Sequence, residues 1–427
     1  MGKLTKILLL LLIGMSLGGA VAQNSIDSPY SRFGLGMLES NSVNVQLRAM
    51  GGIGNAIGSQ RIVNSANPAT YAAFDSLSFL FDAGLSLSTV GYRTTTQTES
   101  GNYANLAYFA AGFPVTAWWK SAVGLQPFSH ISYEVNAKST TNEGLDYIRS
   151  YSGEGGLNKL YFGNAFALVK NVSIGVNASY VFGRNTTSSL VYFTDSLSMA
   201  NTKVDSRMMV SDFIIDYGAL YSLRFQNDMA LHFGLIYSHS TNLAVKGEQL
   251  VVSRFGGIGD NIPQLIDTIF YDKKQKETIQ LPPKVGFGLS LEKPDSWLVG
   301  LDFNWQNWEA YPMPTSVDSL GKSWNLSVGG QFTPSHTSIS GYWKRVTYRM
   351  GAQYNQTYLQ LNGHQITDFG ISFGVSLPMP RSLTTLDLSL EVGRRGTMAD
   401  NLIRETYANL TVGIAIYERW FVKRKYN

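Results

Sequence analysis

The chain contains no cysteine, and this absence excludes a disulfide scaffold, a thiolate metal site and a lipid anchor on cysteine. Charged residues are also scarce, at 15% of the 427 residues, against about 25% in typical soluble domains. Beyond the N-terminus, no apolar run approaches the roughly 20 residues that a membrane-spanning helix needs. The net charge of +4 is too close to neutral to indicate a nucleic-acid partner.

Small and aromatic residues are abundant instead. The sequence holds 42 Gly and 23 Tyr, and hydrophobic residues make up 44% of it. Few charges, many Gly and Tyr and no apolar helix together favour an all-β protein, a transmembrane antiparallel β-barrel with one face toward lipid and one toward water.

The first 22 residues have the features of a secretory signal peptide. Lys3 and Lys6 precede an apolar stretch from Ile7 to Leu17, and Ala20-Val21-Ala22 forms a small-x-small cleavage site. The alternative, a transmembrane anchor, is disfavoured because the apolar stretch is too short. We expect a signal peptide at 1–22, an N-terminal hatch or plug segment at 23–77 and a barrel at 78–427.

From about residue 78 onward, apolar and polar residues alternate. On one such segment Val172, Ile174 and Val176 share a face, while Ser173 and Gly175 share the other. This alternation predicts strands, and segments longer than 10 residues are typical of tilted membrane crossings. We expect about fourteen strands, at 78–89, 105–113, 120–138, 157–168, 172–184, 209–224, 229–240, 283–292, 297–307, 323–333, 344–355, 367–378, 383–394 and 406–418. Pro127 should bend the third, because proline cannot donate to a ladder.

Long connections alternate with mostly short ones, and the longest expected loop is 241–282. Outer-membrane barrels have short periplasmic turns and long outer loops, so both chain termini should be periplasmic. Tryptophans should form an aromatic girdle at the two rims: Trp118, Trp119, Trp297, Trp343 and Trp420 at one, and Trp305, Trp308 and Trp324 at the other. Charged residues within the strands fall on the polar face, namely Asp82, Glu134, Asp216, Asp302, Arg349, Asp387 and Glu391.

Residues 23–77 do not alternate and are rich in glycine. Gly52-x-Gly54 is only a weak match to a dinucleotide-binding loop, because no buried strand precedes it and the spacing fails the full fingerprint. Because glycine lets backbones approach closely, we expect this segment to fold inside the barrel lumen as a plug.

With these features the chain resembles the long-chain fatty acid transporter (FadL) family of outer-membrane proteins. The resemblance rests on the order of Asn67-Pro68-Ala69, Gly124-Leu125-Gln126-Pro127-Phe128, the Trp305/Trp308 pair and Tyr348-Arg349-Met350-Gly351-Ala352. It implies a barrel in the outer membrane of a Gram-negative cell, with Asn67, Pro68 and Ala69 as the hatch motif. It also implies uptake of hydrophobic small molecules such as long-chain fatty acids, often through a lateral gap in the wall.

Some residues expected to face the lumen are apolar and are candidate contacts for such a cargo. They are Tyr161, Val181, Ile214 and Leu220 of the wall and Phe33 and Leu35 of the plug. The alternative is that they only pack the plug against the wall, which the filled lumens of small barrels favour. Two other functions stay open: an accessory barrel subunit of an outer-membrane secretion or assembly complex, with other outer-membrane proteins as partners, and an open porin.

Catalysis, metals and cofactors find little support in the sequence. Of five histidines only His232 should face inward at mid-strand, and a Ser–His–acid set could be assembled from any barrel with this many Ser and Asp. No His/carboxylate spacing is typical of a metal site. We therefore expect no enzyme activity, no cofactor, and outer-membrane lipids as the surroundings. The basic end after Trp420-Phe421 is either a periplasmic contact or a solvated tail.

Overall fold

The computed structural model describes residues 28–39, 44–193, 199–255, 264–310, 319–339, 341–380 and 382–419. The expected signal peptide, Trp420 and the basic tail lie outside these residues. Within the described ranges, no helix has both the length and the apolar character needed to cross a bilayer.

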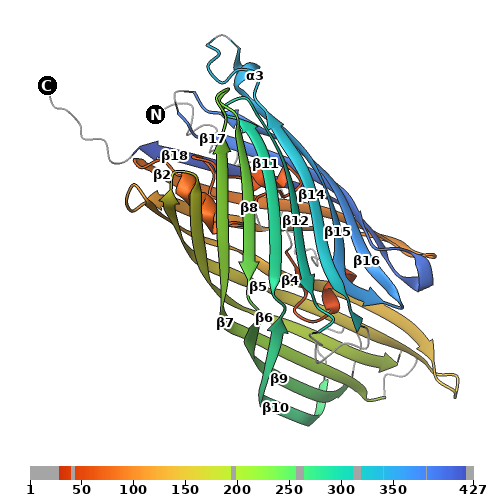
Figure 1. The fold of residues 1–427 in the computed structure, drawn as a ribbon. Helices are drawn as coiled ribbons and strands as arrows, with labels where there is room; N and C mark the ends of the chain where they lie inside the picture. Colours follow the sequence, from red (N-terminus) through yellow and green to blue (C-terminus); the bar gives the residue numbers. More distant parts are fainter. Residues whose placement is uncertain are drawn as a thin grey trace, which may run out of the picture.

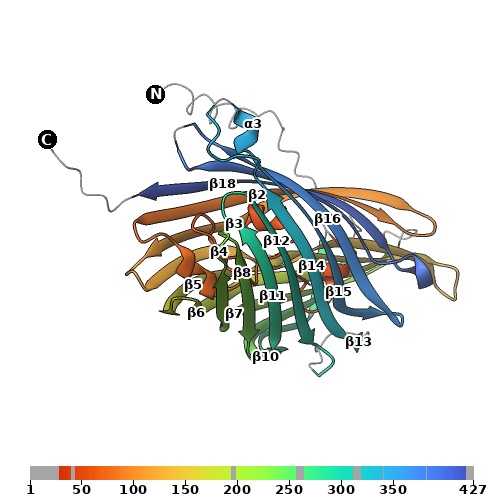
Figure 2. The same ribbon diagram turned by 45° about the horizontal axis from the view of Figure 1, so that its top comes forward.

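The chain folds into a closed antiparallel barrel (Figure 1). Fourteen wall strands follow one another, as the sequence predicts. Two of them are interrupted and carry two labels each: β8 and β9 form one wall strand, and β10 and β11 form another. The barrel closes where β18 pairs with β2, for example Val412 opposite Leu85, and Figure 2 shows these two strands side by side. The wall strands are β2 (Ser78–Arg93), β3 (Thr98–Pro114), β4 (Trp119–Thr140), β5 (Asp146–Val169), β6 (Val172–Phe193), β7 (Asn201–Arg224), β8 (Ala230–Ser238), β9 (Thr241–Phe255), β10 (Gln264–Leu281), β11 (Lys284–Lys293), β12 (Trp297–Asn307), β14 (Lys322–Phe332), β15 (Thr347–Leu361), β16 (His364–Pro378), β17 (Thr385–Arg395) and β18 (Arg404–Arg419).

Side chains alternate across the wall as a barrel in lipid requires. On β6, Ile174 is exposed on the outer face, while Ser173 and Asn177 are buried on the inner face. Most of the in-strand charges point inward, and Asp82, Asp302, Arg349 and Asp387 are buried there. We call the rim where β2 begins and β18 ends the near rim, and the opposite one the far rim.

The prediction of a loop at 241–282 is wrong. Strands β9 and β10 form a hairpin there, and it extends beyond the far rim (Figure 1). Strands β6 and β7 likewise continue through most of the expected loop 185–208. A strand is recognised in the sequence by alternation only where one of its faces is apolar. Outside the membrane a strand needs only paired backbone groups, so the sequence need not alternate there. The break between β10 and β11 falls at Pro282-Pro283, whose nitrogens cannot donate.

Trp308 does not belong to the aromatic girdle. It follows the end of β12 and turns into the lumen, where its ring stacks on Tyr358 at a centroid distance of 4.8 Å. It is 1% exposed, at the centre of an apolar cluster near the far rim. Proximity to a strand end therefore does not decide on which side of the wall a tryptophan lies. Pro127 acts as expected, since the β4–β5 register shifts between Pro127 and Ser129.

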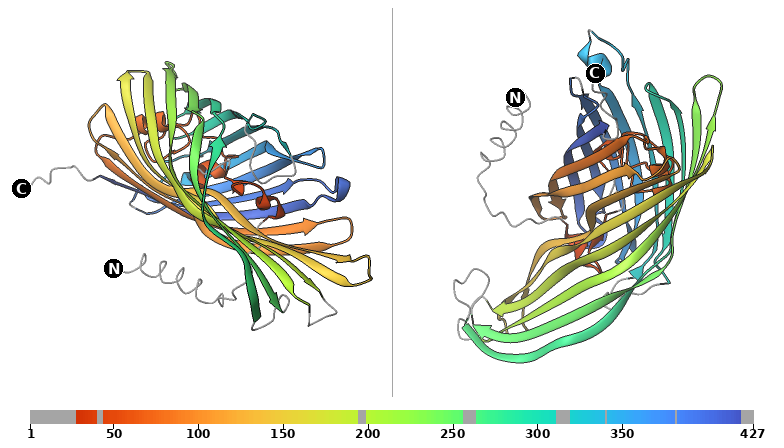
Figure 3. Two further views of the ribbon diagram at one scale, coloured as in Figure 1. Left: turned by 90° about the horizontal axis from the view of Figure 1, so that it is seen from below. Right: turned by 90° about the vertical axis from the view of Figure 1, so that its left-hand side faces the viewer.

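The described parts of the N-terminal segment, residues 28–39 and 44–77, lie inside the barrel (Figure 3). It contains η1 (Pro29–Arg32), β1 (Met37–Leu38), α2 (Val45–Arg48) and η2 (Pro68–Ala73), two of them capped by the side chains of Asn44 and Asn67. These elements contact two parts of the wall: η1 lies on β4, η2 on β4 to β7, and α2 on β16 to β18.

Inward-facing glycines let this segment approach the wall backbone. A Cβ added at Gly218 would overlap the side chain of Asn67, and one at Gly234 would overlap the carbonyl oxygen of Asn55. The same crowding against residues 45–74 recurs at one glycine on most strands, so the contact circles the lumen. This glycine belt comprises Gly84, Gly112, Gly163, Gly175, Gly218, Gly234, Gly288, Gly300, Gly329, Gly351, Gly374 and Gly413.

Polar groups of the wall hold the segment at the same level. Asp302 accepts from the backbone nitrogens of Gly54 (2.6 Å) and Asn55 (2.7 Å), so the glycine-rich turn binds a wall carboxylate. Asp387 accepts from Gln46 Nε2 at 2.9 Å. Because a buried carboxylate without partners is costly, these bonds fix where the segment lies.

The belt predicts that Gly234→Ala loosens the N-terminal segment, because the added methyl group has no room beside Asn55. Overpacking of this kind costs about 1–3 kcal/mol. Limited proteolysis should cut residues 28–77 faster in this variant, with the wall strands still resistant. Gly91→Ala is the control, since its Cβ would meet nothing closer than Thr406 O at 3.8 Å. Equal cleavage rates in the two variants would contradict the role of the belt.

Candidate functional site

The wall is interrupted between β3 and β4. These strands pair only from Phe109 opposite Leu125 to Pro114 opposite Lys120, at the near rim. From that point toward the far rim, β3 still pairs with β2 and β4 still pairs with β5, but β3 and β4 no longer pair with each other. Two local features coincide with the end of the ladder: an extra residue in β3, Ala107, at its register shift with β2, and Pro127 in β4. Bulges bend strands and proline ends pairing, so the two edges separate. We call this opening the window.

Part of the N-terminal segment covers the β4 side of the window. Strand β1 pairs with β4, with Met37 opposite His130 and Leu38 opposite Ser129. The backbone nitrogen of Glu39 donates to Phe128 O at 3.0 Å, and that of Ser28 donates to Ser132 O, also at 3.0 Å. The edge of β4 that loses β3 is thus satisfied by backbone from inside the lumen.

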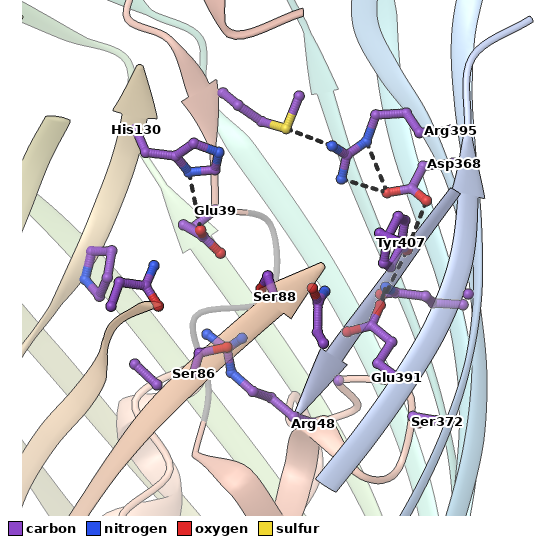
Figure 4. Close-up of a pocket in the computed structure, with 18 of the residues that line it drawn as sticks. Glu39, Arg48, Ser86, Ser88, His130, Asp368, Ser372, Glu391, Arg395 and Tyr407 are labelled. Atoms are coloured by element: carbon purple, nitrogen blue, oxygen red, sulfur yellow. Dashed lines mark hydrogen bonds and ion pairs between the residues drawn. The ribbon is translucent and has the colours of Figure 1, made fainter. Parts of the chain in front are cut away.

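Behind the window is a polar cavity of about 100 Å³ (Figure 4). The N-terminal segment contributes Glu39, Arg48 and the Gly51-Gly52 turn, and the wall contributes mostly polar side chains. The wall residues that line it include Ser86, Ser88, Asn105, His130, Gln353, Asp368, Ser372, Glu391, Arg395, Tyr407 and Asn409.

Charges around this cavity are paired across elements. Arg395 contacts Asp368 at 3.0 Å and Glu405 at 3.2 Å, and Tyr407 Oη donates to Asp368 at 2.8 Å. On the opposite side Glu39 lies 3.2 Å from His130 Nδ1. Such a lining suits water and small polar groups, whereas an apolar molecule would strip water from these charges without replacing it.

Glu39 shows how strongly this surrounding acts. Burial alone would raise the pKa of its carboxyl, but the hydrogen bond and charge of His130 outweigh that, with help from Arg48 and Arg395. The pKa of Glu39 falls from 4.5 to about 2. The carboxylate is therefore charged at any physiological pH.

The hatch motif lies against the wall at two glycines of the belt. Asn67 caps η2, and its Nδ2 donates to Asn55 O at 2.6 Å and to Ala219 O at 3.1 Å. Pro68 and Ala69 lie directly over Gly175 and Gly218. The motif therefore joins two parts of the N-terminal segment to β7.

The six candidate cargo contacts do not form one group. Phe33, Leu35, Val181 and Ile214 meet in the apolar cluster at the far rim, beside Trp308. Tyr161 and Leu220 lie closer to the near rim. They pack in separate clusters, Tyr161 with Tyr71 and Leu220 with Ala69. Leu35 and Val181 have no exposed surface, so their contacts here are with other side chains of the protein.

None of the charged cavity residues is recognisable as a site residue from the sequence. Polar alternation places Asp368 and Glu391 on the inner face, but nothing in it brings them to Arg395 and Arg48. Glu39 and Arg48 belong to a segment without periodicity, so only the closed barrel and the docked segment bring these charges together.

His232 does face inward and has two partners. Its Nδ1 lies 2.7 Å from Ser222 Oγ and its Nε2 3.1 Å from Glu292 Oε1. Ser222 is its direct cross-strand neighbour and Glu292 lies on the adjoining β11, so the register of the ladders explains both contacts. The cavity behind the window does not include these residues. Among the described residues no cluster of three His, Asp or Glu side chains is arranged to hold a metal ion.

A family model described as BamG matches residues 3–427 of the chain. No curated protein matches it. Three solved structures share its fold: the Pseudomonas putida toluene transporter TodX (TM-score 0.59, 15% identity, 90% of this chain and 99% of that one), the Ralstonia pickettii toluene transporter TbuX (0.58, 14%, 88% and 99%) and the CymD monoaromatic hydrocarbon channel (0.57, 14%, 89% and 98%). All three are named as transporters or channels, and at these identities the likeness is one of fold.

The shifted pKa of Glu39 predicts an acid-dependent contribution to stability. Because its folded pKa of about 2 is below the unfolded value of 4.5, this stabilisation is complete above about pH 4.5 and is lost as pH falls toward 2. Glu39→Gln should lower stability at pH 6 by up to about 3 kcal/mol, and the difference from wild type should shrink between pH 4.5 and 2.5. Thermal unfolding followed by tryptophan fluorescence measures this.

The exposed Glu143, in the connection between β4 and β5, provides the control as Glu143→Gln, which should show no such trend. A stability difference for Glu39→Gln that stays constant from pH 6 to 2.5 would show that the charge of Glu39 does not stabilise the fold.

Proposed function

We propose that this chain, which belongs to the BamG family, is an accessory barrel subunit of a secretion or assembly complex in the Gram-negative outer membrane. The observation that carries the proposal is the open edge of β10 beyond the far rim. On the expected orientation this edge is extracellular, where a partner protein can reach it.

Strand β10 is paired along its length with β9. The next wall strand, β12, pairs with β11 and β14 instead, so the described residues provide no ladder for the other edge of β10. The tip of this edge strand is apolar and exposed, with Leu265 at 64% and Ile269 at 60%. Ile266, Phe270 and Tyr271 are exposed as well.

A long edge strand with apolar side chains is a liability unless it is covered. Natural proteins protect such edges with charges and bulges, and β10 has both between residues 272 and 277, with Lys273 and Lys276 beside a register shift. Residues 265–271 contain one charged residue, Asp267, and two register shifts, but five of their seven side chains are apolar or aromatic and exposed. A polypeptide that adds a strand there would pair the free backbone groups and bury the apolar side chains. We therefore infer that the occupant is an extended segment of another protein of the complex.

The interior of the barrel supports a role in which little passes through it. The glycine belt brings the N-terminal segment against the wall backbone on most strands, as a plug would lie, and the window opens onto paired charges. An apolar cargo leaving through the window would have to displace or cross Arg395, Asp368 and Glu39.

The test replaces three exposed residues at the tip of β10, as Leu265→Asp, Ile269→Asp and Phe270→Asp together. The added charges should prevent strand addition and reduce the recovery of stably co-purified outer-membrane proteins at least tenfold. The control carries Val, Val and Leu at the same positions, which keeps the surface apolar. Quantitative mass spectrometry of complexes purified from native membranes compares the two.

A photo-cross-linking residue at position 269 should give one defined protein adduct. The same residue at position 213, which is equally exposed on the outer face of β7, should not give that adduct. Unchanged recovery of partners in the aspartate variant, with identical cross-links at both positions, would refute the proposal.

A second candidate function is the uptake of hydrophobic small molecules, including long-chain fatty acids. The shared fold with the toluene transporters favours it, and so does the apolar cluster at the far rim, where Phe33, Leu35, Val181 and Ile214 would be the first contacts of an entering cargo. For such a cargo to pass, these buried side chains must move apart.

Mass spectrometry of the purified barrel should then detect retained lipid-like molecules, and deletion of the protein should slow uptake of a labelled fatty acid. Val181→Asp should reduce both, because it places a charge in the apolar cluster. A barrel without any retained molecule, together with normal uptake in the deletion strain, would exclude this second function.

A further inference from the structure

The outer face of the wall carries an apolar groove of about 1130 Å³ across β12 to β18, toward the near rim. The groove is deepest at Gly330, which has no side chain, and at Ala352, which has only a methyl group; we call these two residues its floor. Larger outward side chains surround this floor, including Val299, Phe332, Tyr348, Met350, Phe373 and Leu390. The convex wall of a barrel does not by itself offer such a concave surface.

The near-rim end of this groove leads to the connection between β14 and β15, which contains α3 (Tyr342–Arg345; top of Figure 1). Tyr348, which lines the groove, donates from its hydroxyl to the backbone oxygen of Trp343 at 3.2 Å. Trp343 is 68% exposed and Ile339 in the same connection is 99% exposed. The apolar surface thus continues from the wall onto this connection.

Two basic residues end α3, beside the exposed aromatic rings. Lys344 is exposed, and the guanidinium carbon of Arg345 lies 5.5 Å from the ring centre of Tyr342. The Nε atom of Arg345 is buried and has no hydrogen-bond partner among the described residues. Positive charge therefore lies next to the end of an apolar groove, at a level where aromatic residues mark the membrane surface.

We propose that the groove and α3 together bind one phospholipid of the leaflet at the near rim. Its acyl chains lie in the groove, and its phosphate contacts Lys344 and Arg345. Its volume is above the roughly 300–1,000 Å³ of typical small-molecule pockets, which leaves room for long acyl chains. Flexible chains fill an irregular concave wall well, and basic residues at a membrane surface attract lipid phosphates.

Charge argues against the unplaced end of this chain as the occupant. Residues 422–425 are Val-Lys-Arg-Lys, so this tail would bring like charges toward Lys344 and Arg345. A partner barrel would cover the apolar wall but would leave the positive charge of α3 without an anion. The lipid site is separate from the edge of β10 and does not depend on the proposed function.

The experiment uses the full mature protein in a mild uncharged detergent, titrated with dipalmitoyl phosphatidylglycerol and examined by native mass spectrometry. We expect one lipid per barrel to be retained at low lipid concentration. Ala352→Phe fills the floor of the groove and should reduce retention at least fivefold. Its control is Ala178→Phe, which places the same ring on the outer face of β6, away from the groove.

The charge arm reverses both cations, as Lys344→Glu with Arg345→Glu, and should reduce retention about tenfold. Its control reverses Lys170 and Arg224, two exposed cations of the near rim outside the groove. Inorganic phosphate should not displace the lipid, because it lacks acyl chains. The charge variants lie in connections or at a strand end, so they test the site even if the substitution at Ala352 impairs folding.

Equal retention in each variant and its control would overturn the proposal. Displacement by inorganic phosphate alone would do the same, since it would reduce the site to a surface anion contact. A co-purified protein cross-linked to position 352, with no lipid retained by the wild type, would assign the groove to a protein partner instead.

Discussion

The structure depends on the close approach of two backbones, that of the N-terminal segment and that of the wall. Inward glycines on most strands make the approach possible, since a Cβ at most of them would overlap the segment. Buried wall groups such as Asp302 and Asp387 then accept its hydrogen bonds. Inside a closed barrel, an unpaired backbone or carboxylate group has little water to bind, so this docking is strongly constrained. The alignment of β1, Glu39 and Arg48 with the window follows from it.

The window shows how two local irregularities acquire a chemical consequence. An extra residue in β3 and a proline in β4 separate the strands, and the edge that opens is satisfied from inside by β1. What lies behind it is a set of paired charges. A wall opening in a barrel of this fold therefore need not be a route for apolar molecules, because its lining decides what can pass.

The fold is shared with hydrocarbon transporters at 14–15% identity, while the matching family is BamG. Shared folds carry different functions, so the weight falls on particular surfaces of this chain. Two of these surfaces are apolar: the edge of β10 that no described strand pairs, at the far rim, and the concave wall beside α3, at the near rim. Both bury apolar surface only when something else is bound, and this is why we place partners, protein and lipid, at the centre of the proposals.

The sequence by itself determined the barrel, its fourteen strands and the inward side of most charged residues, because alternation records directly which face meets lipid. From its glycine content the sequence also predicts that residues 23–77 fold in the lumen as a plug, and this stays a prediction. It did not determine that 241–282 is a hairpin, since strands outside lipid need no apolar face, or that Trp308 turns inward. Only the tertiary structure brought Glu39, His130, Arg395 and Asp368 around one cavity. Asp368 and Arg395 are cross-strand partners on the consecutive strands β16 and β17, whereas Glu39 and His130 come from two other parts of the chain. The proximity of these three parts arises from barrel closure and docking, which no local pattern encodes.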